Sequence, residues 1–256
     1  MIKNLITAMQ FLTIVTVHKE YQEEERSFAR SIVYFPVVGF LIGFVLINAD
    51  RLMLTAALPQ TIANILLVAL SVLITRALHI DGLADTLDGL MGGYDEQSRL
   101  AIMKDSRLGT AGAVGIFFIL FLKYTALNNL YESEKSVALL TAPLLARWAQ
   151  TLMIYKSEYG REDGMGKAFV GQLRASGMVA ASALALALSA FVVVRMDARS
   201  GALFLSMLCG VLILTFLGRW FLARKLGGIT GDAIGAVSEL NEVFVLLLCV
   251  AFSSGA

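Results

Sequence analysis

The stretch from Ala202 to Leu222 reads ALFLSMLCGVLILTFLGRWFL and contains one charged residue, Arg219. A helix that crosses a lipid bilayer needs about 20 mostly apolar residues, and this stretch meets that length. Further apolar stretches of the same kind are Phe28–Asn48, Pro59–Ile80, Ala111–Leu130, Ser136–Tyr155, Gly177–Val194 and Val237–Phe252. We therefore predict an all-α fold, a polytopic membrane helix bundle of about 6–8 helices.

The overall composition supports a membrane protein. Hydrophobic residues make up 57% of the chain and charged residues 16%, with a mean hydropathy of +0.74, whereas soluble domains are about half apolar and a quarter charged. The net charge of +1 argues against a nucleic-acid partner. No linker composition divides the chain, so we predict one integral membrane catalytic domain over residues 1–256. Cys209 and Cys249 lie in apolar runs and are interpreted as packing residues.

The placement of lysine and arginine predicts the orientation. If Asp81–Thr110 faces the cytoplasm, alternation of the spans places Lys3–Arg30, Lys156–Arg174 and Arg219–Asp232 on the same side. These segments hold most of the basic residues outside the spans, as expected for cytoplasmic loops. We interpret Met1–Val17 as a short helix on or entering the membrane. The polar loops thus predict an active site at the cytoplasmic face of the cell inner membrane, with lipid around the bundle.

The most informative polar stretch, His79 to Gly93, reads HIDGLADTLDGLMGG. Asp81, Asp85 and Asp88 are spaced so that a helix continuing from the preceding span carries them on one face. Carboxylates placed so closely repel one another, and oxygen ligands of this kind suit Mg²⁺ better than zinc. A solvated acidic loop is the alternative, but it explains the shared face less well. We predict that these aspartates bind Mg²⁺.

A second polar stretch, Lys104 to Gly112, reads KDSRLGTAG and precedes an apolar run. Its serine or threonine is placed to cap the following helix, whose amino terminus and glycines offer backbone N–H groups to an anion. Its lysine and arginine suit phosphate oxygens, and its aspartate is a further candidate metal ligand. The candidate residues here are Lys104, Asp105, Ser106, Arg107, Gly109 and Thr110.

A third polar stretch, Gly227 to Glu242, reads GGITGDAIGAVSELNE and leads into the last apolar run. Asp232 and Glu239 share one helical face, and ionisable groups that enter a span are functional candidates. The alternative is a helix start with Thr230 or Asp232 as its cap. Arg147 lies within another span and requires an acidic partner. We assign candidate substrate-binding roles to Thr230, Asp232, Glu239 and Arg147.

Three motifs together resemble the cobalamin synthase family, whose members are adenosylcobinamide-GDP ribazoletransferases. They are His79–Gly89, Lys104–Gly109 and Gly228–Asp232, the last followed by Gly235, Ala236 and Glu239. The resemblance covers essentially the whole chain. It implies that α-ribazole, or its 5′-phosphate, is joined to adenosylcobinamide-GDP with release of GMP and a requirement for Mg²⁺.

The resemblance also suggests roles for individual residues. Mg²⁺ on Asp81, Asp85 and Asp88, with Asp105 as a fourth candidate, would neutralise the diphosphate. The catalytic candidates are Asp85, Asp88 and His79 as proton acceptors, and Lys104 and Arg107 as phosphate-binding cations. A structural role for His79 at a helix end is equally compatible with the sequence. Asp232 and Glu239 are candidates for a second ion or for the ribazole hydroxyls.

Two other functions deserve comparison. A CDP-alcohol phosphotransferase of phospholipid synthesis also uses spaced aspartates and glycines at a membrane surface, but its pattern expects an arginine where Asp85 stands. An ion-coupled transporter tends to bind its ion near the midplane between repeated halves, whereas these aspartates lie at the end of a span and no repeat is evident. The sequence leaves open whether the protein is a homo-oligomer.

Overall fold

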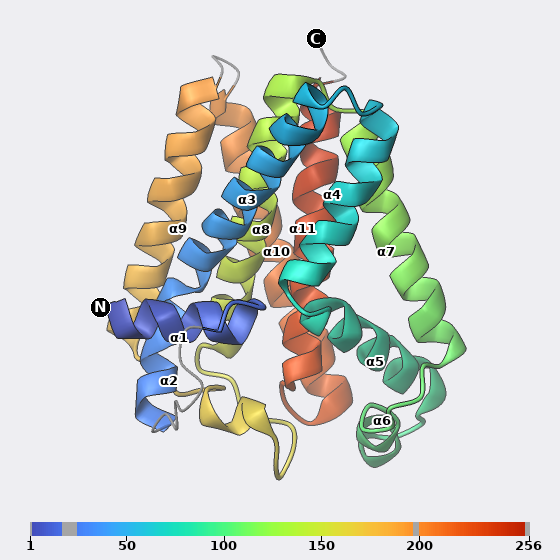
Figure 1. Cartoon of the computed structure of the whole chain (residues 1–256). Coiled ribbons are helices and arrows are strands. Elements are labelled where there is room, and N and C mark those ends of the chain that lie inside the picture. The colour runs from blue at the N-terminus through green and yellow to red at the C-terminus, as the bar shows by residue number, and fades with distance from the viewer. Residues whose placement is uncertain (1, 17–24, 197–199, 254–256) are drawn as a thin grey trace.

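The computed structural model describes residues 2–16, 25–196 and 200–253 (Figure 1). These residues form helices, and the described part of the chain contains no strand, only an isolated bridge between Tyr159 and Ile229. The all-α prediction is therefore confirmed. The α-helices are α1 Ile2–Leu12, α2 Glu25–Ser31, α3 Phe35–Thr55, α4 Gln60–Ile74, α5 Leu78–Gly92, α6 Glu96–Ile102, α7 Thr110–Asn128, α8 Glu132–Ile154, α9 Ala175–Met196, α10 Ser200–Leu226 and α11 Gly231–Ser253, and the 3-10 helices are η1 Ile32–Tyr34 and η2 Met165–Ala168.

Six helices among the described residues are long and apolar enough to cross a membrane. They are Phe28–Thr55, Thr110–Asn128, Glu132–Ile154, Ala175–Arg195, Gly201–Leu226 and Gly231–Ser253. This supports the prediction of a multi-pass membrane protein. Cys209 and Cys249 are free thiols within these helices, and Cys249 is buried as expected of a packing residue, whereas Cys209 is exposed. The predicted helix over Met1–Val17 is observed as α1, although Met1 and residues 17–24 lie outside the described part.

The prediction that the acidic helix continues the span over Pro59–Ile80 is wrong, although α4 and α5 together are long and apolar enough for one broken span. The axes of α4 and α5 differ by 85°. At Arg76 and Ala77, φ is 53° and 58°, in the left-handed region that terminates a right-handed helix. As a result α5 runs across the lower end of the bundle in Figure 1 instead of extending the line of α4.

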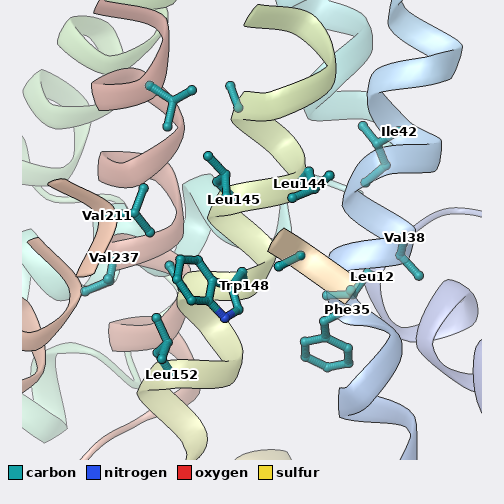
Figure 2. Packing of buried hydrophobic residues seen from close by; sticks show 14 of the residues in the cluster. Leu12, Phe35, Val38, Ile42, Leu144, Leu145, Trp148, Leu152, Val211 and Val237 are labelled. Atoms are coloured by element: carbon teal, nitrogen blue, oxygen red, sulfur yellow. The ribbon is translucent and has the colours of Figure 1, made fainter. Parts of the chain in front are cut away.

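The core is built around α8, which is buried over almost its whole length. Figure 2 shows Leu144 on the side of α8 that faces Ile42 of α3, and Leu145 on the opposite side. A Cβ added at Gly39 of α3 would lie 2.3 Å from the carbonyl oxygen of Pro143 in α8. Small residues allow backbones of membrane helices to approach in this way, so α3 and α8 form a close-packed centre.

The polar segments gather at one end of this bundle. In Figure 1, α5, α6, the connection from α8 to α9 and the start of α11 all lie at the lower end, opposite the carboxyl end of the helix α11. The polar stretches that the sequence singled out therefore share one surface.

Candidate active site

At this end of the bundle, three acidic side chains raise the pKa of a fourth, Asp85. Asp81, Asp85 and Asp88 come from α5, which lies outside the six candidate spans, and Asp232 comes from the first turn of α11. Burial, followed by the charges of Asp232 and Asp81, raises the pKa of Asp85 from 3.8 to about 7, although Arg161 acts in the opposite direction. The acidic cluster thus carries more negative charge than its neighbours balance, which favours a bound cation.

Glycines bring Asp232 to the acidic face of α5. A Cβ added at Gly82 would lie 2.9 Å from the Cα atom of Asp232, and one at Gly235 would lie 3.1 Å from the carbonyl oxygen of His79. Side chains at these positions would force α5 and α11 apart. The glycine that interrupts the acidic motif is therefore required by the crossing of the two helices.

Asp88 has a structural contact as well as a place in the cluster. Its two carboxylate oxygens accept hydrogen bonds from the backbone N–H groups of Gly109 and Gly112, each at 2.8 Å. This carboxylate, supplied by α5, satisfies the amino terminus of α7. The expectation that Ser106 or Thr110 caps α7 is wrong, because α7 has no side-chain cap of its own and both residues are exposed. A Cβ at either glycine would collide with the carboxylate.

The basic side chains of the second motif lie at the surface between α6 and α7. Arg107 is 87% exposed and forms an ion pair with Asp105, and this arginine lowers the pKa of Asp105 to about 2. Lys104 is also exposed. The Asp105 carboxylate accepts hydrogen bonds from the backbone N–H and from the guanidinium of Arg107. Its metal-binding role stays a prediction.

Arg161 is a candidate that the sequence did not reveal. Its Nη2 atom lies 2.6 Å from a carboxylate oxygen of Asp232 and 3.4 Å from the carbonyl oxygen of Met103. The bridge between Tyr159 and Ile229 ties the segment of Arg161 to the residues that precede α11. In the sequence Arg161 is one of several charged residues in a polar loop, and only this tertiary contact distinguishes it.

Arg147 and Glu239 belong to a buried network inside the bundle. Lys123 lies 2.7 Å from Glu239 and 3.0 Å from Glu242, and Arg147 lies 2.7 Å from Glu242. All four side chains are at most 8% exposed. The predicted acidic partner of Arg147 is thus Glu242, and two positive and two negative charges balance each other. These ion pairs join α7, α8 and α11 inside the bundle.

His79 and Thr230 occupy buried positions near the same helix crossing. Thr230 is fully buried, and its hydroxyl oxygen accepts a hydrogen bond of 3.1 Å from the backbone N–H of Ala233, which is the helix-start role considered above. His79 is 2% exposed and lies beside Gln150. Within the described part of the chain its Nδ1 atom has no hydrogen-bond partner. A neutral imidazole fits this position because burial lowers the pKa of His79 well below 6.5.

The acidic cluster offers carboxylate oxygens, which are the kind of ligand that Mg²⁺ takes. Among the described residues, no group of three His, Cys, Asp or Glu side chains is arranged to hold a metal ion. Mg²⁺ usually takes only one or two protein carboxylates and completes its shell with water and substrate phosphates. Asp81 is exposed and Asp85 is partly exposed, so their oxygens are accessible. The residues fit a Mg²⁺ ion shared with a phosphate-bearing substrate.

Comparisons with known proteins place nearly the whole chain in one family. A family model described as Cobalamin-5-phosphate synthase matches residues 4–250. Proteins named adenosylcobinamide-GDP ribazoletransferase from Geotalea daltonii and Thermoanaerobacter pseudethanolicus are 40% and 37% identical, and in both cases 98% of each chain is covered. A protein of the same name from Syntrophobacter fumaroxidans is 38% identical over 94% of this chain and 95% of its own. No solved structure matches. The chain belongs to the cobalamin-5-phosphate synthase family.

Proposed function

We propose that this protein is an adenosylcobinamide-GDP ribazoletransferase. It joins α-ribazole, or its 5′-phosphate, to adenosylcobinamide-GDP and yields adenosylcobalamin, or its 5′-phosphate, and GMP. Full-length similarity to relatives of that name supports the proposal. The observation that carries it is the acidic cluster around Asp85, because a diphosphate substrate with Mg²⁺ would offset its excess negative charge.

The reaction requires one bond to form and one to break. A ribazole hydroxyl oxygen attacks the phosphorus that carries cobinamide, the bond from that phosphorus to GMP breaks, and GMP leaves with the electron pair. Asp81, Asp85 and Asp88 form the proposed metal set, and bound Mg²⁺ supplies neutralisation of the diphosphate and the leaving group. Between Asp85 and Asp88, Asp85 suits the hydroxyl proton better, because it is partly exposed and both carboxylate oxygens of Asp88 already accept backbone hydrogen bonds.

The remaining candidate residues are proposed either to bind phosphate oxygens or to position the acidic cluster. Lys104 and Arg107 are exposed beside the cluster, where they can bind phosphate oxygens. Arg161 holds Asp232, in the first turn of α11, in position through an ion pair of 2.6 Å. The exposed hydroxyls of Ser106 and Thr110, in the connection before α7, complete the proposed contacts with the diphosphate. The backbone N–H of Gly109, a further candidate from the sequence, already donates to Asp88.

The proposal includes an orientation. We place the acidic end of the bundle at the cytoplasmic face of the inner membrane. The excess of lysine and arginine in the segments at that end supports this placement. Soluble nucleotide substrates would then reach the acids without crossing the bilayer.

The direct experiment supplies the purified protein with each substrate in turn. We expect GMP and the cobalamin product only when adenosylcobinamide-GDP and α-ribazole are both present. A CDP-alcohol phosphotransferase would instead release CMP from a CDP-activated alcohol. Turnover in detergent solution, where there is no second compartment, would exclude a purely transporting protein. Failure to release GMP from the complete mixture would contradict the proposal.

A further inference from the structure

A small cavity adjoins the acidic cluster. Its volume is about 100 Å³, and its walls come from α1, α3, α5, α8, α11 and the η2 segment. Asp81 and Asp232 line it and reach solvent, whereas Phe35 and Phe169, which also line it, are only 1% and 4% exposed. The cavity therefore changes from acidic at its solvent side to apolar and aromatic inside.

The phenylalanine rings of the apolar walls pack against one another in two orientations. The rings of Phe11 and Phe35 are stacked, with centroids 5.9 Å apart and planes inclined by 19°. The rings of Phe11 and Phe169 meet edge to face, with centroids 5.6 Å apart. Aromatic rings prefer these stacked and edge-to-face arrangements with one another. A planar ring entering the cavity would find partners for both.

His79, which lines the cavity, has a buried ring nitrogen without a hydrogen-bond partner among the described residues. His79 and Gln150 line the cavity, and each is only 2% exposed. The Gln150 amide donates a hydrogen bond of 2.9 Å to Ser238, but the Nδ1 atom of His79 has no partner in the described part of the chain. Buried polar atoms are almost always hydrogen-bonded, so a ligand with a ring nitrogen would complete this environment.

We propose that this cavity binds the heteroaromatic base of the acceptor nucleoside, with its ribose hydroxyls at Asp81 and Asp232. This inference rests on the proposed function and specifies one of its substrate subsites. The base stacks against Phe169 and Phe11 and offers a ring nitrogen to His79. The ribose then lies where Asp85 can accept a hydroxyl proton.

The donor's guanine is the competing occupant, and the cavity suits it less well. Guanine carries several polar groups along its edge, each of which loses water on burial and then needs a hydrogen-bond partner. The buried part of the cavity wall offers few such side-chain partners beyond His79 and Gln150, because Asp81 and Asp232 lie at its solvent side. A base with an apolar outer ring matches the phenylalanine walls better.

The test compares Michaelis constants of the full-length enzyme for its two substrates. For Phe169→Ala we expect KM for α-ribazole to rise about tenfold, the scale of a lost aromatic contact, while KM for adenosylcobinamide-GDP changes less than about twofold. Phe28→Ala is the matched control, because Phe28 packs 5.5 Å from Phe169 but does not line the cavity. We expect this control to leave both constants near the wild-type values.

A second measurement uses the free base of α-ribazole as an inhibitor. We expect it to compete with α-ribazole and not with adenosylcobinamide-GDP. A rise in KM for the donor alone in Phe169→Ala would assign the cavity to guanine and overturn the inference, as would an unchanged KM for α-ribazole. Equilibrium dialysis of α-ribazole separates the two proposals: if wild-type protein releases no GMP, weaker binding by Phe169→Ala would still support the cavity, and equal binding would refute it.

Discussion

The carboxylate of Asp88 on α5 accepts a hydrogen bond of 2.8 Å from the backbone N–H of Gly109, which immediately precedes α7. The same carboxylate accepts a second bond from Gly112. One acidic side chain thereby fixes the acidic helix against the connection that carries Lys104 and Arg107. The metal-binding and phosphate-binding parts of the proposed site are held in register by this contact.

Removing this contact should weaken the fold. For Asp88→Ala we expect a loss of about 0.5–2 kcal/mol, the range measured for helix caps, because the amino terminus of α7 loses its acceptor. The measurement is the thermal unfolding midpoint in detergent. Asp81→Ala is the control, because Asp81 lies exposed on the same helix. An unchanged midpoint for Asp88→Ala would show that the cap contributes nothing.

The close crossing of α5 and α11 predicts that Gly82 cannot be replaced. In Gly82→Ala the new Cβ would meet the backbone of Asp232 at 2.9 Å, so the helices must separate and displace Asp232 from the α5 acids. We expect GMP release to fall at least about tenfold, the scale of effect that a misplacement of reacting groups can reach. Gly201→Ala is the control, because nothing lies within 4 Å of its added Cβ. Wild-type activity in Gly82→Ala would argue against the crossing.

The raised pKa of Asp85 predicts how stability depends on pH. Its pKa is about 7 in the folded protein against 3.8 when unperturbed, so the folded state holds the proton more tightly. Without a metal ion, ionisation of Asp85 therefore destabilises the fold progressively between these values, and the loss is complete above pH 7.

Asp85→Asn isolates this effect, because the amide stays neutral. In metal-free buffer we expect its unfolding midpoint to exceed that of the wild type increasingly from pH 4 to pH 7, with a constant difference above. Added Mg²⁺ should then stabilise the wild type more than the variant at pH 8. A difference that stays the same at every pH would mean that Asp85 ionises normally.

The buried ion pairs predict a rescue by a second substitution. Arg147→Met leaves Glu242 with Lys123 as its remaining cation, and we expect destabilisation of about 3–5 kcal/mol, as found when one partner of a buried pair is removed. Adding Glu242→Gln leaves the pair of Lys123 and Glu239 balanced. We expect this double variant to recover the yield of folded protein and most of its turnover. Recovery of folding without turnover would instead indicate that Arg147 contacts substrate.

The sequence predicted the parts of the fold that depend on composition. Apolar runs long enough to span a bilayer appear as helices, and the aspartate spacing predicted a helix that is observed as α5. The 85° bend before it was not predictable, because Thr75, Arg76 and Ala77 include neither the glycine nor the proline that usually marks a left-handed turn. Packing against the bundle, not local preference, imposes that conformation.

The site was predictable only as a set of local motifs. Asp81, Asp85 and Asp88 were recognisable because regular spacing places them on one face. Arg161 was not, because its contact with Asp232 joins segments 71 residues apart. The cap that Asp88 provides for α7 is also a long-range contact, which local capping rules assign to nearby side chains such as Thr110. Tertiary contacts of this kind leave no periodic pattern in the amino-acid sequence.

The aspartates of α5 are proposed to bind Mg²⁺ together with the diphosphate substrate. The most direct measurement is the rate of α-ribazole-dependent GMP release as Mg²⁺ is titrated, for the wild type and for Asp81→Asn and Asp85→Asn. We expect no release without Mg²⁺, saturation in the wild type, and loss of most activity in both variants while each remains folded. GMP release that is independent of Mg²⁺, or full activity in either variant, would contradict Mg²⁺ binding by these aspartates.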